Sequence, residues 1–343
     1  MSYYRAVAQA AAATSTVDRI GVLVVNLGTA DAPSYLAVQR YLREFLSDRR
    51  VIDRAPLLWL PLLYGVILPL RPLRTARNYL RIWTADGSPL AVYSRRLAHK
   101  IGAALQASCG DSLRVELGMT YGKPSIESAI QRLAEQGVRR LLVLPLYPQY
   151  CSATTGSVYD RVGDVLKRWR WLPALRIIND YYRDPGYVDA WATRIARLWQ
   201  QRGERSHLVL AYHGIPETYV RDGDPYQRQA QETTRLISGR LNLSPDEFSH
   251  CYQSRFGPVA WLQPYTRDAL LGLAKRGIRK LTVVSPSFAV DCLETLEEVA
   301  IEYRDQFLQL GGERFDFVNC LNDDDEHAQF LAALIRRNLA GWA

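Results

Sequence analysis

The feature that most constrains the fold is an internal repeat. PSIESAIQRLAEQGVRRLLV, from Pro124 to Val143, aligns without a gap with PYTRDALLGLAKRGIRKLTV, from Pro264 to Val283, at a constant offset of 140 residues. Each copy predicts a helix, a glycine that ends the helix, and a buried strand. The fold class is therefore expected to be α/β, with two similar halves that are each a parallel sheet flanked by helices.

Chain length also favours two domains, because a chain of 343 residues exceeds the size at which one hydrophobic core keeps growing. We expect residues 18–172 to form the first half and residues 173–324 the second, followed by a C-terminal helix at 325–343. Residues 1–17 are rich in alanine and lack the strongly apolar core of a signal peptide. They are expected to form a flexible N-terminal arm.

Charge and cysteine usage exclude several classes of protein. The net charge of +8 suits nucleic acid, an anionic membrane or an anionic small molecule. No dense Lys/Arg run accompanies a nucleic-acid-binding motif, so nucleic acid is not an expected partner. The five cysteines are scattered and contain no C-x-x-C pair, which argues against a zinc site, a local iron–sulfur motif and a disulfide framework. These features predict a reduced, cytoplasmic protein.

The second copy of the repeat continues into a helix lined with acids. Leu281 to Val284 read as a buried strand, and beyond it the hydrophobic period changes from 2 to 3.6. At α-helical spacing, five carboxylates share one stripe of the following helix, while apolar side chains face the core. The stripe consists of Asp291, Glu294, Glu298, Glu302 and Asp305.

Two interpretations of this stripe stand side by side. A solvated helix face explains it, and acids also suit the first turn of a helix. Its location favours a function, because open α/β sheets bind ligands beyond the carboxyl ends of their strands. Carboxylates there can bind a cation or relay protons. His213 ends another predicted strand of the same half, and it is either structural or a partner of these acids. Such an N/O ligand set suits Fe²⁺, Co²⁺ or Zn²⁺.

An uncharged segment interrupts the first half between residues 55 and 73. Leu57 to Leu70 carry no charge over fourteen residues, fewer than the roughly 20 that span a bilayer. Pro61 and Pro69 are expected to break any helix through the run. One interpretation is a core segment. The other is an exposed apolar lip, bracketed by arginines, that contacts a flat hydrophobic ligand, a membrane surface or both.

Several ordered motifs make the chain resemble the ferrochelatase family, which inserts ferrous iron into a porphyrin. The resemblance runs from Ile20 to about Leu334. It rests on VNLGT at Val25 to Thr29, PQYCSATTG at Pro148 to Gly156, YHGIP at Tyr212 to Pro216, GDPY at Gly223 to Tyr226, QSRFGPVAWLQPYT at Gln253 to Thr266 and DCLETLEE at Asp291 to Glu298. It implies two Rossmann-like halves with the porphyrin in a cleft between them.

The resemblance also implies roles for single residues. His213 and Glu294 correspond to the active-site histidine and glutamate and are the expected metal-handling pair, and Asp291 and Glu298 are the accompanying acids. Tyr121 looks like a porphyrin-pocket tyrosine. Residues 55–73 look like the apolar lip beside the pocket, with Leu57, Leu58, Leu62 and Leu63 as its expected porphyrin-binding residues.

The chain departs from the family pattern at three places. Cys292 replaces a histidine of the animal members, and Thr120 stands where many members have an arginine that contacts a porphyrin carboxylate. The chain ends at Ala343 without the cysteine-bearing tail that holds a [2Fe–2S] cluster in some relatives. No cluster or other cofactor is therefore expected, and Fe²⁺ is a substrate.

The expected reaction inserts Fe²⁺ into protoporphyrin IX, gives protohaem and releases two protons, as the terminal step of haem synthesis. A base must take the pyrrole protons, and His213 can accept a proton or bind iron near pH 7. The alternatives are a chelatase for another tetrapyrrole or metal, such as coproporphyrin or cobalt, and a non-catalytic haem or porphyrin carrier. A cytoplasmic location with peripheral contact to the inner face of an anionic membrane is expected. The sequence leaves the oligomeric state open.

Overall fold

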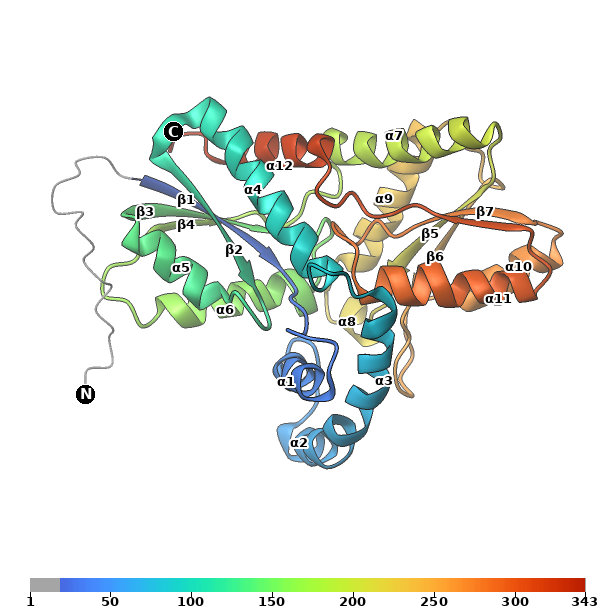
Figure 1. The fold of residues 1–343 in the computed structure, drawn as a ribbon, viewed down its shortest axis with the longest axis horizontal. Helices are drawn as coiled ribbons and strands as arrows, with labels where there is room; N and C mark the ends of the chain where they lie inside the picture. Colours follow the sequence, from blue (N-terminus) through green and yellow to red (C-terminus); the bar gives the residue numbers. More distant parts are fainter. Residues whose placement is uncertain (1–18, 343) are drawn as a thin grey trace. The chain divides into compact units, whose positions relative to one another are not determined.

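The computed structural model describes residues 19–342 and divides into two compact units (Figure 1). The first comprises residues 19–146, 152–179 and 323–342, and the second comprises residues 147–151 and 180–322. The boundary follows residue 179 instead of 172, because β4 (Ala174–Ile177) pairs with a strand of the first unit. The C-terminal helix α12 (Asp325–Asn338) also belongs to the first unit. The arm expected at residues 1–17 lies outside the described residues.

The first unit is a parallel sheet with helices on both faces (Figure 1). Its strand order is β2-β1-β3-β4, where β1 spans Arg19–Asn26, β2 Leu113–Met119 and β3 Val138–Pro145. Helices α5 (Ile126–Glu135) and α6 (Ser157–Leu166) cover one face, and α4 (Pro89–Cys109) and α12 cover the other. The apolar run Val22 to Val25 is fully buried because both faces are covered.

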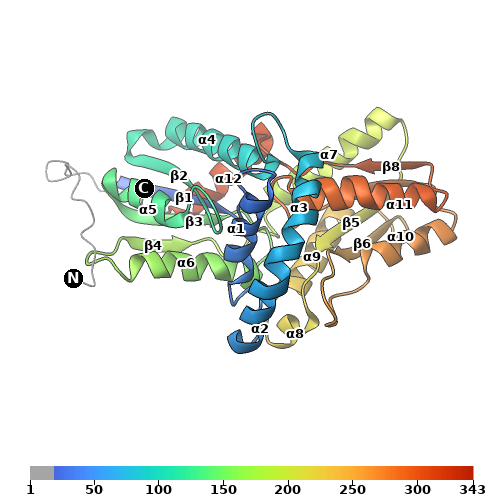
Figure 2. The same ribbon diagram turned by 60° about the horizontal axis from the view of Figure 1, so that its bottom comes forward.

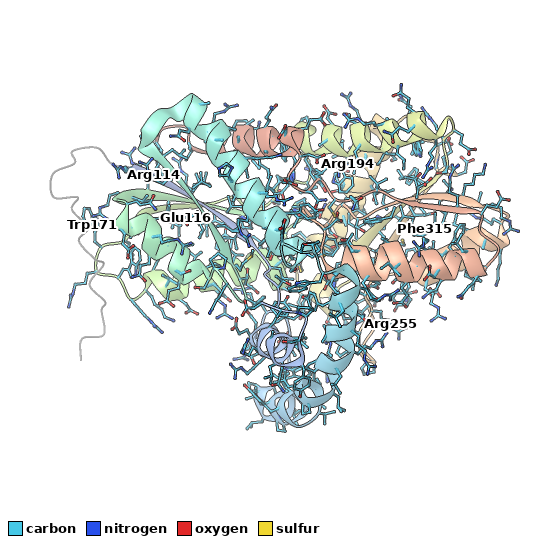
Figure 3. The ribbon with its side chains drawn as sticks, viewed as in Figure 1. Arg114, Glu116, Trp171, Arg194, Arg255 and Phe315 are labelled. Atoms are coloured by element: carbon cyan, nitrogen blue, oxygen red, sulfur yellow. The ribbon has the colours of Figure 1, made fainter. Side chains whose placement is uncertain are left out.

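The second unit has the same layout. Its parallel sheet has the order β6-β5-β7-β8, with β5 at His207–His213, β6 at Phe248–Gln253, β7 at Lys280–Val284 and β8 at Arg314–Phe317. One face carries α7 (Pro185–Arg202) and α9 (Tyr226–Arg240). The other carries α10 (Thr266–Lys275), η4 (Glu294–Tyr303) and α11 (Arg304–Gln309). A short helix, α8 (Glu217–Arg221), follows β5. Arg194 of α7, labelled in Figure 3, donates to the carbonyls of Asn319 and Cys320 beyond β8.

The structure confirms the repeat and the fold class that it predicted. Helices α5 and α10 begin 140 residues apart, and each precedes a glycine in the left-handed region, Gly137 at φ 82° and Gly277 at φ 80°. The strands that follow, β3 and β7, occupy the same place in their sheets. The correspondence continues beyond the repeat found in the sequence, since Thr155 and Thr295 are both fully buried at the same offset.

Strand register extends this correspondence to the strand tips. Leu23 pairs with Val143, and Val209 pairs with Val283, so β1 and β5 are offset by 186 residues. By this register, Leu27 occupies in the first unit the position that His213 occupies in the second. At the offset of 140, Val158 likewise corresponds to Glu298. The acid–base residues predicted from the sequence therefore belong to one half of the repeat only.

The uncharged segment forms a continuous helix, so the expectation that its prolines break it is wrong. Residues Pro56–Ile82 run through α2 (Pro56–Leu62), the π-helix η1 (Leu63–Ile67) and α3 (Leu68–Ile82). Pro72 cannot donate to the carbonyl of Leu68, and Gln39 supplies that hydrogen bond from α1 (Tyr35–Leu46) at 3.1 Å. The wider π-turn lies between Pro61 and Pro69, as is common where a helix accommodates a distortion.

This helix is long and apolar enough to cross a membrane by length and composition, and 22% of its apolar window is buried in the protein. Figure 2 shows α1, α2 and α3 lying together at one side of the first unit. Leu57 is 90% exposed and Leu58 is 77% exposed, whereas Leu63 is fully buried. The exposed lip of the sequence analysis is thus present, but Leu63 is part of its packed side.

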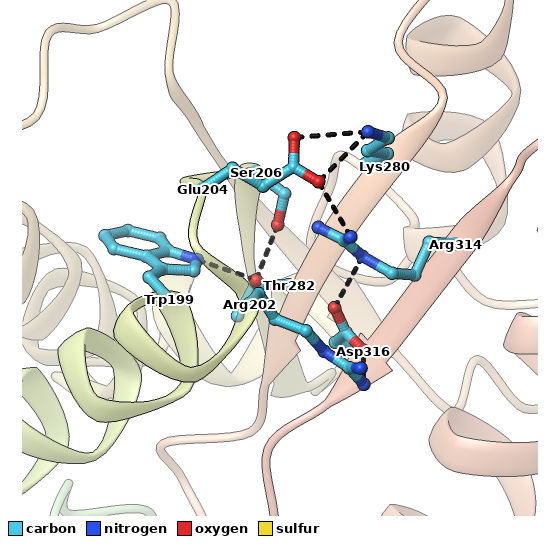
Figure 4. Close-up of polar contacts among 8 residues, drawn as sticks. All are labelled: Trp199, Arg202, Glu204, Ser206, Lys280, Thr282, Arg314 and Asp316. Atoms are coloured by element: carbon cyan, nitrogen blue, oxygen red, sulfur yellow. Dashed lines mark hydrogen bonds and ion pairs between the residues drawn. The ribbon is translucent and has the colours of Figure 1, made fainter.

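The amino-terminal ends of β7 and β8 carry a polar network (Figure 4). Asp316, whose side chain is 6% exposed, lies between Arg202 at 2.6 Å and Arg314 at 2.9 Å. Glu204 joins Arg314 and Lys280 at the surface. The network is at the opposite end of the strands from His213, so it stabilises the sheet away from the site.

Candidate active site

His213 is the last residue of β5 and is held in one orientation. Its Nδ1 lies 2.7 Å from the carbonyl oxygen of Gly214, which can only accept, so Nδ1 carries the proton. The lone pair is then on Nε2. The backbone of His213 is fixed as well, because its N–H donates to Ser287 Oγ at 3.2 Å and its carbonyl accepts from Tyr226 at 2.8 Å. The ring lies against Trp261 and Phe288.

The glycine after His213 is required by close packing. Gly214 donates its N–H to the carbonyl of Gln253 at 2.8 Å. A Cβ at Gly214 would lie 2.9 Å from that carbonyl and 3.1 Å from the Trp261 ring. The His-Gly pair therefore lets the chain leave β5 directly beside the end of β6.

The acids lie on a wider helix than the sequence indicated. Residues Glu294–Tyr303 form a π-helix, which makes i→i+5 hydrogen bonds and needs more than four residues per turn. Glu294, Glu298 and Glu302 are four residues apart and remain on one side of it. The first two are half-buried and Glu302 is exposed, so the line of acids runs from the interior to the surface.

Strand register and core packing put His213 on the same face of the sheet as this helix. Side chains alternate along a strand, so His213 shares a face with Ala211, two residues earlier. Ala211 and Cys251 pack in one core cluster with Val299, the residue after Glu298. Helix η4 therefore covers the face on which His213 ends β5.

Glu298 is fixed by three hydrogen bonds from its own unit. Ser254 donates from its backbone nitrogen at 2.9 Å and from its hydroxyl at 2.5 Å, and Tyr303 donates at 2.6 Å. Burial, with the Glu298 carboxylate as a further cause, raises the pKa of the Tyr303 phenol, so this donor stays protonated. The three donors fix the position of the Glu298 side chain.

Asp291 does not lie on the helical stripe, and that expectation is wrong. It precedes the helix and is fully buried. Its oxygens accept hydrogen bonds from four groups that join the start of η4 to the chain beyond β8: Thr295 Oγ1 at 3.0 Å, Asn319 Nδ2 at 2.8 Å, Asn322 Nδ2 at 2.7 Å and the backbone nitrogen of Cys320 at 3.2 Å.

Glu294 lies at the first position of η4, next to a buried thiol. Burial raises the pKa of Cys292 well above its usual value, and the charge of Glu294 and a hydrogen bond to its carboxylate raise it further. Cys292 is therefore a neutral donor to Glu294. Cys292 precedes the helix, as Asp291 does.

Comparison with known proteins decides the family. Residues 19–339 match the Ferrochelatase family model. A protein of Thioalkalivibrio sulfidiphilus named Ferrochelatase is 47% identical over 323 residues, which are 94% of this chain and 88% of the relative. A Ferrochelatase of Marinomonas sp. is 46% identical over 94% of this chain and 98% of the relative. The chain belongs to the ferrochelatase family. It is accordingly an enzyme, a metal chelatase of haem synthesis.

Solved structures show the same fold at low sequence identity. SirB from Bacillus subtilis with Fe³⁺ matches with a TM-score of 0.56 and 13% identity, over 94% of this chain and 96% of that one. CbiX, described as the terminal enzyme for biosynthesis of sirohaem in denitrifying bacteria, matches with a TM-score of 0.51 and 15% identity, over 92% and 98%. The two-unit parallel architecture is thus shared with other chelatases.

The porphyrin-binding residues expected for a ferrochelatase lie in the first unit. Tyr121 is 1% exposed; its hydroxyl donates to Asp48 at 2.9 Å and its ring packs against Phe45. Leu57, Leu58 and Leu62 are exposed on the lip, in contrast to Leu63. His213, Glu294 and Glu298 belong to the second unit.

Two site residues escaped sequence reasoning although they lie inside a recognised motif of the ferrochelatase family. Gln253 and Ser254 begin QSRFGPVAWLQPYT, and neither carries a charge that would draw notice. Ser254 is one of few non-glycine residues in the left-handed region, at φ 65°. That conformation directs both its N–H and its hydroxyl to Glu298. No feature of the sequence alone encodes it.

Proposed function

We propose that His213 takes the pyrrole protons of free-base protoporphyrin IX as Fe²⁺ enters the ring, and that Glu294 and Glu298 serve the same step. The observation that carries this proposal is the orientation of His213, whose Nδ1–H is bonded to Gly214 and whose Nε2 lone pair is on the face covered by the acid-lined helix. A neutral imidazole is suited to accept a proton near pH 7.

The two glutamates act differently in this mechanism. Glu298, fixed by its three hydrogen bonds, stabilises the imidazolium that forms at His213. Glu294 has the thiol of Cys292 as its neutral neighbour and can accept a proton or bind the incoming metal. Glu302 is exposed and passes protons to water. Asp291 holds the start of η4 and so positions Glu294.

The proton count closes over one turnover. Two pyrrole N–H protons leave in succession, each through Nε2 of His213, and Fe²⁺ replaces them on the ring nitrogens. His213 returns to its neutral form after each transfer, and both protons end in bulk water. Within residues 19–342, no three His, Cys, Asp or Glu side chains form a metal-binding cluster. In this proposal iron is handled as a substrate by His213 and Glu294.

The substrate preference follows from the apolar lip. Leu57 and Leu58 expose hydrocarbon surface, which suits the vinyl edge of protoporphyrin better than the additional propionates of coproporphyrin. The same surface, followed by the exposed Arg74 and Arg77, suits contact with an anionic membrane from the cytoplasmic side. Turnover of the two porphyrins, compared at matched concentrations, tests the first part of this proposal. Vesicle binding tests the second.

A metal-insertion assay tests the central proposal. Purified protein, free-base protoporphyrin and Fe²⁺ under reducing, anaerobic conditions should give protohaem, and His213→Ala should abolish most of the rate. Full activity of His213→Ala would contradict the assignment. The same preparation should be colourless and free of inorganic sulfide, because we also propose that the enzyme works without an iron–sulfur cluster. Visible iron–sulfur absorbance would contradict that.

A further inference from the structure

Gln253 is a buried polar side chain for which the fold gives no internal reason. It is the last residue of β6 and 1% exposed. Neither its Nε2 nor its Oε1 has a hydrogen-bond partner among the described residues. Leaving such groups unsatisfied costs about 1–3 kcal/mol each, so native proteins rarely keep them without a function or a bound water.

Strand register places this amide beside His213. Gln253 pairs with His213 across β6 and β5, and paired residues of parallel strands direct their side chains to the same face. Cys251, two residues earlier on β6, packs in the core cluster under η4. The amide therefore lies on the face that carries both the imidazole and the acid-lined helix, in a layer closed to bulk solvent.

A second unpartnered group lies on the other side of His213. Ser285 follows β7, is fully buried, and its Oγ has no partner among the described residues. Its neighbour Val284 pairs with Leu210, so Ser285 is level with Ala211 and shares the face of His213. Two uncharged hydrogen-bonding side chains, from β6 and β7, thus flank the end of β5.

We propose that Gln253, assisted by Ser285, holds a buried water molecule that takes the proton from Nε2 of His213 and delivers one to Glu294. This inference rests on the proposed function of His213. The imidazolium loses its Nε2 proton to the water, the water gives one of its own protons to the Glu294 carboxylate, and His213 is neutral again. Glu298 does not receive the proton, because its oxygens already accept three hydrogen bonds.

Uncharged amide and hydroxyl groups suit this task. A buried water needs two to four polar partners, and an amide offers both a donor and an acceptor. Neither side chain changes charge during turnover, so the water keeps its position while protons pass. Gln253 is thereby a positioning residue and not an acid or base.

The test replaces the amide by a group of similar shape that cannot hold water. In Gln253→Met, kcat should fall about ten- to hundredfold, the loss typical of residues that orient a reacting group, with a smaller change in the porphyrin KM. The solvent deuterium isotope effect on kcat should increase, because proton transfer becomes rate-limiting. The melting temperature should change little, because the substitution removes no hydrogen bond to another described residue and keeps a side chain of similar shape. Gln253→Glu, which keeps an acceptor oxygen, should recover part of kcat.

A matched control comes from the same unit. Gln229 is also buried, but its amide is satisfied, accepting from the backbone of Tyr150 at 2.6 Å and donating to Asp180 at 3.4 Å. Gln229→Met should lower the melting temperature and leave the isotope effect unchanged, the reverse of Gln253→Met.

The outcomes separate this inference from the proposed function. An inactive His213→Ala enzyme together with unchanged kcat and isotope effect in Gln253→Met would overturn the role of Gln253 alone. A lower kcat with an unchanged isotope effect, or with a lower melting temperature, would overturn it as well, since the side chain would then be structural. Activity retained in His213→Ala would instead overturn the proposed function.

Discussion

Ser254 donates two hydrogen bonds to Glu298, from its backbone nitrogen at 2.9 Å and its hydroxyl at 2.5 Å. Ser254 directly follows Gln253, the register partner of His213, so this contact ties the acid-lined helix to the strand next to the imidazole. It also explains the left-handed conformation of Ser254, since a strained backbone persists where surrounding contacts fix it. Glu298 and His213 are thus both tied to one short segment of chain.

Replacing the acid–base pair should lower turnover more than binding. We expect His213→Ala and Glu294→Gln each to lower kcat by about 10²- to 10⁴-fold, the usual contribution of general acid–base groups. Porphyrin affinity should change much less. The double variant should be no slower than the worse single variant, because both side chains serve one step. Strictly additive losses would mean that the two groups act independently.

The thiol next to Glu294 should prove unreactive and of limited importance. Cys292 is buried and its pKa is raised well above the usual thiol value, so it stays protonated at neutral pH. Native protein should resist alkylation at Cys292, and unfolded protein should react at once, as followed by peptide mass spectrometry. Cys292→Ser keeps a donor and should retain more activity than Cys292→Ala. A loss equal to that of Glu294→Gln would make the thiol a participant.

Substitutions in the lip should distinguish exposed leucines, which contact a ligand or membrane, from the buried leucine, which stabilises the fold. Leu57→Ser with Leu58→Ser removes two exposed side chains, so vesicle binding should weaken by about tenfold per leucine and the porphyrin KM should rise. The melting temperature should not change. Leu63→Ser should instead destabilise the protein by about 3 kcal/mol, because Leu63 is fully buried. Unchanged vesicle binding and KM in the double variant would show that the exposed leucines contact neither ligand.

The ion network at the opposite end of the second sheet should contribute to stability alone. Asp316→Asn leaves Arg202 and Arg314 without their buried partner, and we expect a loss of about 3 kcal/mol in the free energy of unfolding. Glu204→Gln is the matched control, since its side chain is 42% exposed and shares Arg314; its loss should be much smaller, because exposed ion pairs contribute little to stability. Equal losses in urea titrations would contradict the difference in burial.

The half-buried His250 should make stability depend on pH. Burial lowers the pKa of His250 to about 4, whereas its unfolded value is about 6.5. Above pH 6.5 neither state binds the proton, and His250 contributes no pH dependence. As the pH falls from about 6.5 to about 4, only the unfolded chain gains a proton, so stability decreases by up to about 3 kcal/mol.

His250→Phe tests this expectation, because it keeps a ring beside Tyr212 and cannot titrate. The unfolding free energy of the variant should vary less between pH 7 and pH 5 than that of the parent. The exposed His99 is the control, and His99→Gln should leave the pH dependence as it was. An identical slope in the parent and in His250→Phe would assign the pH dependence to other groups.

The repeat and the hydrophobic runs predicted most of the fold, because those patterns follow the periods of buried strands and amphipathic helices. The same reasoning failed where one local distortion changes the geometry. A fixed 3.6-residue period could not show that Glu294 begins a π-helix or that Asp291 is buried before it. Proline rules gave the wrong result at Pro61 and Pro69, because the helix widens to a π-turn between them. At Pro72, Gln39 of another helix replaces the missing hydrogen bond.

The site was predictable only in part for a similar reason. The acid stripe and the histidine at a strand end attract notice in the sequence, and the resemblance to the family then singles out His213 and Glu294. Ser254 and Gln253 are uncharged, and their importance arises from backbone conformation and register, which appear only when the chain is folded. Burial of Leu63 between exposed neighbours likewise depends on the packing of the lip helices.

The proposed acid–base residues occur in only one half of the repeat, so the other half can be compared with it position by position. Leu27 and Val158 stand where His213 and Glu298 stand in the other half, on strands and helices of the same order. The first unit therefore shows the same arrangement of strands and helices without the histidine and the glutamate. The helical lip between β1 and α4 likewise belongs to the first unit.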